Sequence, residues 1–188
     1  MSPRAIRPPR SPRHRPGLVH LYTGAGKGKT TAAWGLALRA AGHGWRVKIV
    51  EFLKGPRVAG EHLAARRLGR LVSVETGGLG FFFGRGAAER ARHRAAAARA
   101  LARAARALAS GRWDLVVLDE AADAVGLKLI KCADLVRAVR GRAAGVEAVV
   151  TGRGASAGLC RLADYFTEMR ARRHPYARGV EGRRGIEF

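Results

Sequence analysis

The sequence contains no asparagine and no glutamine among its 188 residues, and acidic side chains are scarce. Only 14 Asp and Glu residues stand against 36 Lys and Arg residues, which gives a formal net charge of +22. A charge of this size can indicate a polyanionic partner such as nucleic acid, an anionic membrane or a phosphorylated small molecule. The strong preference for arginine over lysine and the missing amides are equally typical of GC-rich coding or of heat-resistant proteins. We therefore do not expect nucleic-acid binding to be the main role.

Cysteines and long apolar runs are also scarce. Cys132 and Cys160 are the only cysteines, and the absence of CxxC or Cys/His spacing argues against structural zinc and for a reducing compartment. No apolar run approaches the roughly 18–20 residues of a membrane span. The first sixteen residues carry five arginines and no acid, and they lack the apolar core of a secretory signal. We expect a cytoplasmic protein with no membrane association, in which a disordered basic Pro/Arg-rich arm (1–16) precedes one domain (17–188).

The hydrophobic pattern predicts an α/β fold. Apolar β-rich runs alternate with helical patterns, which is typical of a single-domain, mostly parallel sheet with helices on both faces. Strands are expected at 18–22, 47–53, 71–74, 115–118 and 146–150, and helices at 29–41, 87–110, 134–140 and 156–163. The runs LVVL and VEAVV are continuously apolar, which favours central strands that are covered on both sides.

The run YTGAGKGKTT carries the clearest chemical signal. A phosphate-binding P-loop reads G-x-x-x-x-G-K-[ST], and Gly28-Lys29-Thr30 supplies its end. The opening glycine would stand at position 23, where this chain has Thr23, so the loop is one residue short or opens on a β-branched residue. Between a strand and a helix, its N–H groups would form an anion site. Lys27 and Lys29 add positive charge there, and the Thr30 hydroxyl is placed to bind Mg²⁺.

Two acids end the apolar run Leu115–Leu118. This arrangement is a Walker-B pattern, and it falls at the sheet edge where ligands bind in open α/β folds. Asp119 or Glu120 is therefore expected to hold Mg²⁺ directly or through water, opposite Thr30.

Two Gly-rich stretches leave alternatives open. Gly77–Gly86 places three consecutive phenylalanines in a loop, which either packs into the core or forms an apolar pocket for a large flat ligand. The TGRG run at Thr151–Gly154 follows the strand at 146–150. Arg153 is then either a contact for a phosphate or carboxylate, or an ordinary surface arginine.

Several ordered motifs together resemble one family. The run TGAGKGKTTAAWGLALRAAGHGWRVKIVEFLKG is similar to the N-terminal half of the P-loop type of ATP:corrinoid (cob(I)alamin) adenosyltransferase. In that family a shortened TGxGKGKTTAA loop, an AxGHG turn and a (Q/E)FxKG strand end follow one another. The resemblance continues through GFFF, where the family has GFTW, and through LDE, TGRG, LADYFTEMR and HPYARGVEGRRGIEF. It spans residues 17–188 and implies a RecA-like P-loop NTPase fold.

The resemblance implies an activity other than phosphoryl transfer. In this family the Co(I) centre of cobalamin, or of a cob(I)yrinic acid a,c-diamide precursor, attacks the 5′ carbon of ATP and expels triphosphate, in adenosylcobalamin biosynthesis or salvage. A loop that only holds a leaving triphosphate with Mg²⁺ need not match the loop of a kinase, which would account for the missing residue. The implied partners are ATP, the corrinoid, a flavoprotein or reduced flavin as electron donor, and a second copy of the chain in a homodimer.

The resemblance also assigns residues to roles. The set expected to bind ATP is Gly24, Ala25, Gly26, Lys27, Gly28, Lys29, Thr30, Thr31 and Arg153. The set expected to bind Mg²⁺ is Thr30, Glu120 and Asp119. Phe81 and Phe83 are expected to face the corrin and displace its lower axial ligand, with Phe83 standing where the family has Trp. Because the Co(I) nucleophile belongs to the corrin, no catalytic side chain is expected beyond Lys29 and Lys27, which position ATP and stabilise the leaving group.

Two other functions remain open from the residues alone. A small kinase or RecA-like ATPase would need a full-length loop and a base near the γ-phosphate, and the sequence offers no compelling one. A basic nucleic-acid-binding protein with a regulatory P-loop would show salt-sensitive DNA binding.

Overall fold

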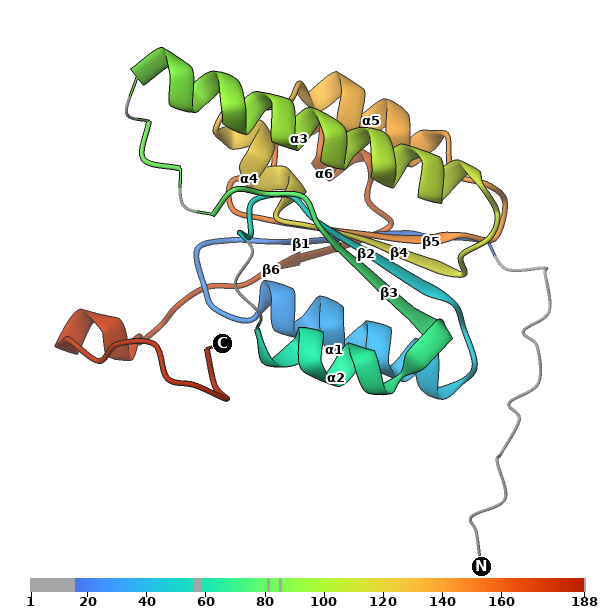
Figure 1. Ribbon diagram of the computed structural model, residues 1–188, viewed down its shortest axis with the longest axis horizontal. Coiled ribbons are helices and arrows are strands. Elements are labelled where there is room, and N and C mark those ends of the chain that lie inside the picture. The colour runs from blue at the N-terminus through green and yellow to red at the C-terminus, as the bar shows by residue number, and fades with distance from the viewer. Residues whose placement is uncertain (1–15, 56–58, 81, 85, 188) are drawn as a thin grey trace, which may run out of the picture.

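A single parallel sheet forms the centre of the molecule (Figure 1). The computed structural model describes residues 16–55, 59–80, 82–84 and 86–187. The six strands lie in the order β3-β2-β4-β5-β1-β6, and all five neighbouring pairs run parallel. Their bounds are β1 (Val19–Thr23), β2 (Val47–Glu51), β3 (Val72–Thr76), β4 (Leu115–Asp119), β5 (Glu147–Thr151) and β6 (Tyr165–Glu168). The expected α/β fold is confirmed, and within the described residues the sheet is entirely parallel.

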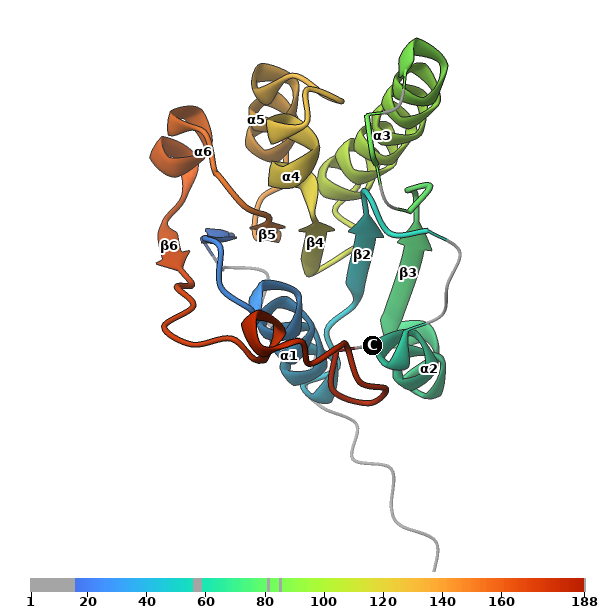
Figure 2. The same ribbon diagram turned by 90° about the vertical axis from the view of Figure 1, so that its left-hand side faces the viewer.

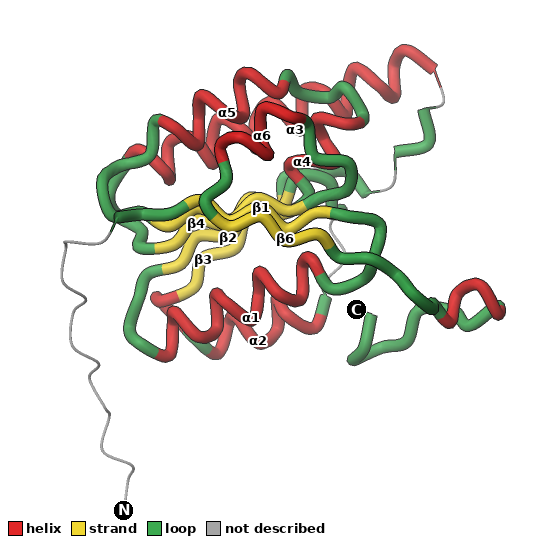
Figure 3. The backbone as a smooth tube through the Cα atoms, turned by 180° about the vertical axis from the view of Figure 1, so that it is seen from behind, coloured by secondary structure: helices red, strands yellow, loops and turns green. Residues whose placement is uncertain are grey.

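Helices cover both faces of the sheet, so the molecule has three layers (Figure 3). One face carries α1 (Lys29–Gly42) and α2 (Gly60–Arg67). The opposite face carries α3 (Gly86–Ala109), α4 (Ala121–Gly126), α5 (Cys132–Arg140) and α6 (Ala157–Leu162). Short 3₁₀ turns occur at Gly69–Leu71 and Pro175–Arg178. None of the helices in the described ranges is long and apolar enough to cross a membrane.

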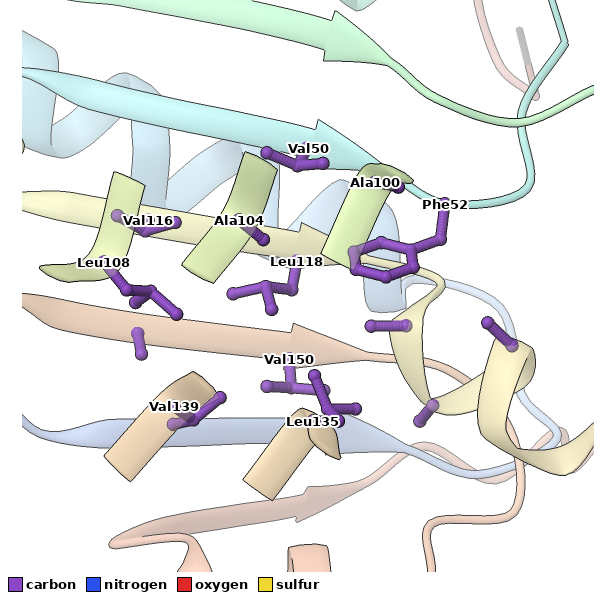
Figure 4. Packing of buried hydrophobic residues seen from close by; sticks show 14 of the residues in the cluster. Val50, Phe52, Ala100, Ala104, Leu108, Val116, Leu118, Leu135, Val139 and Val150 are labelled. Carbon is purple, nitrogen blue, oxygen red and sulfur yellow. The ribbon is translucent and has the colours of Figure 1, made fainter. Parts of the chain in front are cut away.

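The two faces of the sheet pack into separate hydrophobic clusters. On the α3 side, Val50, Val116 and Leu118 of the sheet meet Ala104 and Leu108 of the helix (Figure 4). Small alanine side chains at the contact allow a helix axis to lie close to a sheet, so that the interior stays densely packed. The strand β4 is buried at every position and β5 at all but its first, as their continuously apolar runs predict. The strand β2 is also buried at every position, although it includes Lys48 and Glu51.

Three elements were not expected from the sequence: α2, α4 and β6. The strand β6 is exposed at all four positions, and its pattern gives no alternation of apolar and polar residues. The expected elements are all present, with ends that shift by one or two residues. The basic arm at 1–16 lies outside the described residues except for Pro16.

The parallel arrangement brings the sequence motifs to one edge. Because all strands point the same way, the segments that follow β1, β2, β4 and β5 meet where the strands end. The P-loop follows β1, the acids at 119 and 120 lie at the end of β4, and TGRG begins at the end of β5. In the strand order β5 lies between β1 and β4, so its last residue, Thr151, is central to the site.

Candidate functional site

The P-loop joins β1 to α1 through two glycines in left-handed backbone. Gly24 has φ 97° and Gly28, directly before the first turn of α1, has φ 116°. An L side chain would be strained at both positions, which explains the glycines physically. Ala25, Lys27 and Thr31 are exposed, whereas Gly26 is buried.

The loop rests against the chain that follows β6. The Gly26 N–H donates to the carbonyl oxygen of Met169 at 2.7 Å. A Cβ atom added to Gly24 would lie 2.3 Å from that same oxygen, and one added to Gly26 would lie 2.8 Å from it. These approaches are too short for any side chain, so the glycines are required by the packing of the loop on residue 169. The shortened loop thus has a structural partner outside its own motif.

Lys29 folds back over the loop. Its ammonium donates to the carbonyl oxygens of Gly24 at 2.7 Å and Gly26 at 2.8 Å. Burial lowers the pKa of Lys29, and Arg153 adds to this, while Asp123 and Asp119 oppose the shift. The loop therefore presents a cation bonded to two backbone carbonyls, which phosphate oxygens can replace.

Asp119, at the end of β4, is hydrogen-bonded to α1 and to the end of β5. Its Oδ1 atom accepts from the Thr30 hydroxyl at 2.9 Å and from the Thr151 hydroxyl at 2.7 Å. The residue is fully buried, and its Oδ2 atom has no hydrogen-bond partner among the described residues. The ammonium of Lys54 lies 3.4 Å from Oδ2. A buried carboxylate oxygen without a hydrogen bond is costly, which makes this atom a candidate ligand for a metal ion.

Glu120 occupies a strained position at the start of α4. Its backbone is left-handed (φ 62°), which is rare for a residue with a side chain and typical of functional sites. The Glu120 N–H donates to the Thr151 hydroxyl at 2.8 Å. Burial raises the pKa of the Glu120 carboxyl to about 7, and the neighbouring charge of Asp119 adds to the rise, although Lys54 opposes it. A cation bound beside Glu120 would favour its ionised form.

The donor set fits Mg²⁺ held jointly with a nucleotide. Mg²⁺ prefers oxygen ligands and commonly binds one or two carboxylates together with substrate phosphates. Thr30, Asp119 and Glu120 offer such oxygens, and Asp119 Oδ2 has no hydrogen bond within the described part of the chain. Across the described ranges no group of three or more His, Cys, Asp or Glu residues could hold a metal alone. The phosphate chain would therefore have to supply further ligands.

A buried ionic cluster at the end of β2 was not expected from the sequence. Glu51 is fully buried and accepts from Lys54 at 3.0 Å and from the Thr76 hydroxyl at 2.9 Å, and His62 Nε2 lies 2.9 Å from Glu51 Oε1. Burial alone would lower the pKa of Lys54, but the charges of Asp119 and Glu51 hold it above its usual value. Lys54 thus links this cluster to the proposed metal site.

Arg153 and Asp123 lie at the same edge. The Arg153 N–H donates to Asp123 Oδ1 at 3.0 Å, while Arg153 is exposed. Between β5 and this residue, a Cβ on Gly152 would lie 2.5 Å from the Asp123 nitrogen, so the glycine is needed for the close approach of the two segments. The backbone contact fixes the position of Arg153 at the ligand edge, and its role toward an anion stays a prediction.

The phenylalanine loop divides between core and surface. Phe82 packs against the hydrophobic cluster, with its ring 5.0 Å from the ring of His93 and 5.0 Å from the guanidinium of Arg90. Phe83 is 65% exposed. Phe81 lies outside the described residues. The two alternatives left open by the sequence therefore apply to different members: Phe82 is a packing residue, and Phe83 presents most of its side chain at the surface.

The arrangement of loop, lysine and buried aspartate is that of the P-loop NTPase-like class of α/β proteins. Residues 15–188 match the family model described as "ATP:corrinoid adenosyltransferase BtuR/CobO/CobP". The chain is 36% identical to a corrinoid adenosyltransferase of Pseudomonas aeruginosa over 92% of this chain and 84% of that one. It is 35% identical to the Escherichia coli K12 protein of the same name, with 92% and 86% covered. With the Salmonella typhimurium corrinoid adenosyltransferase CobA the identity is 34%, with 92% and 86% covered. The chain belongs to the ATP:corrinoid adenosyltransferase family, a family of enzymes.

Proposed function

We propose that this protein transfers the 5′-deoxyadenosyl group of ATP to the Co(I) centre of a corrinoid, in adenosylcobalamin biosynthesis or salvage. The cobalt lone pair forms the bond to C5′, the bond from C5′ to the triphosphate oxygen breaks, and triphosphate leaves with that electron pair. Cobalt is formally oxidised from Co(I) to Co(III). The observation that carries the proposal is the family match across residues 15–188. The P-loop of the chain, which ends in Lys29 and Thr30, agrees with it.

The chain's contribution is to bind, orient and neutralise charge. Residues 24–31 would surround the triphosphate, with Lys29 exchanging its two carbonyl partners for phosphate oxygens. Such preorganised donors stabilise the negative charge that develops on a leaving group. Holding C5′ against cobalt supplies the rest of the rate enhancement by orientation. Lys27 within the loop and Arg153 beside it are exposed and add positive charge.

Thr30 and Asp119 would hold Mg²⁺ at the phosphate chain, with Glu120 as a direct or water-mediated ligand. The ion supplies neutralisation of the triphosphate when it is bound. The burial and the neighbouring charge of Asp119, which raise the pKa of Glu120, make a cation at this position favourable for its ionised form.

The corrin would lie against the phenylalanine loop. The exposure of Phe83 supports a contact with a large flat ligand, and Phe81 is proposed to share it on the strength of the family resemblance. Displacement of the lower axial ligand by these rings lowers the coordination of cobalt and makes Co(II) easier to reduce.

We also propose reduced flavin or a flavoprotein as the source of the electron that converts Co(II) to Co(I). We propose further that the protein forms a homodimer and is located in the cytoplasm. Neither Cys132 nor Cys160 forms a disulfide, which agrees with a reducing compartment.

One assay separates this function from its rivals. The protein is mixed with Mg·ATP and chemically reduced cobalamin, and the spectrum of the cobalt–carbon product is followed together with free triphosphate. Corrinoid-dependent formation of both products in equal amounts is expected. ADP or phosphate formed without corrinoid would favour an ATPase or kinase, and tight salt-sensitive DNA binding without corrinoid turnover would favour a nucleic-acid-binding protein.

A further inference from the structure

Within the described residues, the chain after β6 forms two hydrogen bonds with the P-loop. The first contact is the hydrogen bond from Gly26 to Met169, directly after the strand. The chain then continues past α1 towards α2 (Figure 2). The second contact comes near the end of this segment, where the ammonium of Lys27 donates to Glu187 Oε1 at 2.9 Å. Residues far apart in sequence thus meet at the loop proposed to hold the triphosphate.

Glu187 pairs with two cations. Besides Lys27, its Oε2 atom accepts from the backbone N–H of Arg183 at 2.7 Å and lies 3.4 Å from the Arg183 Nε atom. The side chains of Lys27 and Glu187 are 45% and 29% exposed. These contacts, with Lys27 the largest, hold the pKa of Glu187 at about 2, so the carboxylate is charged at neutral pH. A charged carboxylate therefore occupies the Lys27 ammonium, which is expected to bind the phosphate chain of ATP.

We propose that Glu187 is an internal competitor for the triphosphate site, which occupies Lys27 until triphosphate displaces it. The inference rests on the proposed function, since it assumes that the P-loop binds the triphosphate group. A triphosphate and a carboxylate carry like charges, so both cannot approach one ammonium closely without repulsion. Binding of triphosphate then requires the end of the segment to move away from Lys27, while Met169 keeps its start attached to the loop.

The attachment at Met169 makes the competition effective. Because residue 187 belongs to a chain already bonded to Gly26, its carboxylate returns to Lys27 as an intramolecular event. The apparent association constant for triphosphate is then the intrinsic constant multiplied by the fraction of molecules in which Lys27 is free of the carboxylate. Glu187 would thus favour the triphosphate-free state, which must be reached before the next ATP binds.

Binding of inorganic triphosphate with Mg²⁺, measured by calorimetry, tests the inference without any corrinoid. Glu187→Gln keeps the shape of the side chain and removes its charge. Since exposed ion pairs are weak, we expect roughly two- to fivefold tighter binding by this variant than by the natural chain. Glu187→Asp, which keeps the charge, should retain most of the competition. Glu181→Gln serves as the matched control, because Glu181 is exposed in the same segment and the change removes an equal charge.

A second comparison separates competition from general charge. In a Lys27→Ala background the gain from Glu187→Gln should largely disappear, and raised salt should shrink it in the natural background. Triphosphate binding that tightens equally in Glu181→Gln, or that still tightens in Glu187→Gln without Lys27, would overturn the inference.

Unchanged binding by Glu187→Gln, when the natural chain binds triphosphate well, would also overturn the inference, and in that case the proposed function would stand. Failure of the natural chain to bind triphosphate at all would overturn the proposed function and the inference with it. The melting temperature should stay the same in Glu187→Gln, because the carboxylate is at the surface.

Discussion

Replacing Phe83 by alanine should slow the reduction of the corrinoid from Co(II) to Co(I) while leaving the fold nearly intact. The side chain is 65% exposed, so only about a third of a phenylalanine surface of roughly 200 Å² is lost from packing. At about 25 cal/mol per Å² this amounts to at most about 2 kcal/mol, and relaxation of the loop reduces it further. If Phe83 assists reduction of the corrinoid, the rate measured from Co(II) with a weak reductant should fall much more than the rate measured from preformed Co(I).

Phe82→Ala is the matched control, one residue earlier in the same loop. Its ring packs on the hydrophobic cluster and on His93, so its loss should approach the roughly 3–5 kcal/mol of a core phenylalanine and lower both rates together. Thermal melts should show a fall of roughly 6–20 °C for this variant, since 1 kcal/mol shifts the melting temperature of such a domain by about 2–4 °C. A melting temperature of Phe83→Ala as low as that of Phe82→Ala, or an equal fall in its two rates, would mean that Phe83 also serves packing and has no separate role at the corrin.

Three further predictions concern the edge of the sheet that is proposed to bind the phosphates of ATP. Lys29→Ala should abolish ATP binding in calorimetry while the protein stays folded, and near-normal affinity would contradict the P-loop assignment. Thr30→Ala and Glu120→Ala should each require much more Mg²⁺ for activity, whereas unchanged titration curves would mean that the metal binds elsewhere. The raised pKa of Glu120 makes its carboxyl bind a proton more tightly in the folded state, so without Mg²⁺ the free energy of unfolding should fall by up to about 3 kcal/mol as pH rises from 4.5 to about 7. Glu120→Gln should flatten this part of the pH profile, and an equal slope in both proteins would mean that another group causes the fall.

The helices and strands that were predicted from the sequence have strong local sequence patterns. The strands at 115–119 and 147–151 are rich in apolar residues, and the GKGKTT run fixes the start of α1. In contrast, β6 has two aromatic residues, a threonine and an acid, all exposed, so its place in the sheet depends on pairing with β1 and not on its own pattern. The six residues of α4 are too few to show a helical period.

The residues of the candidate site divide in the same way, into those predicted from local motifs and those whose role depends on the fold. Thr30 and Asp119 belong to known motifs, and the structure brings their side chains to 2.9 Å. The role of Thr151 depends on β5 lying between β1 and β4, and strand order cannot be read from local sequence. The contact from Lys54 to Asp119 likewise needs the ends of β2 and β4 to be neighbours. The packing of Met169 on the loop explains why Gly24 and Gly26 are glycines, but it joins residues that only the fold places together.

The fate of the two ends of ATP distinguishes adenosyl transfer from every reaction at the γ-phosphate. ATP labelled in its adenosine part, and separately in its γ-phosphate, is incubated with the protein, Mg²⁺ and chemically reduced corrinoid. We expect the adenosine label to move to the corrinoid while the γ-phosphate label is recovered in intact triphosphate, in equal amounts. Recovery of the γ-label as free phosphate or on another acceptor, with the adenosine label left in ADP, would contradict adenosyl transfer by this protein.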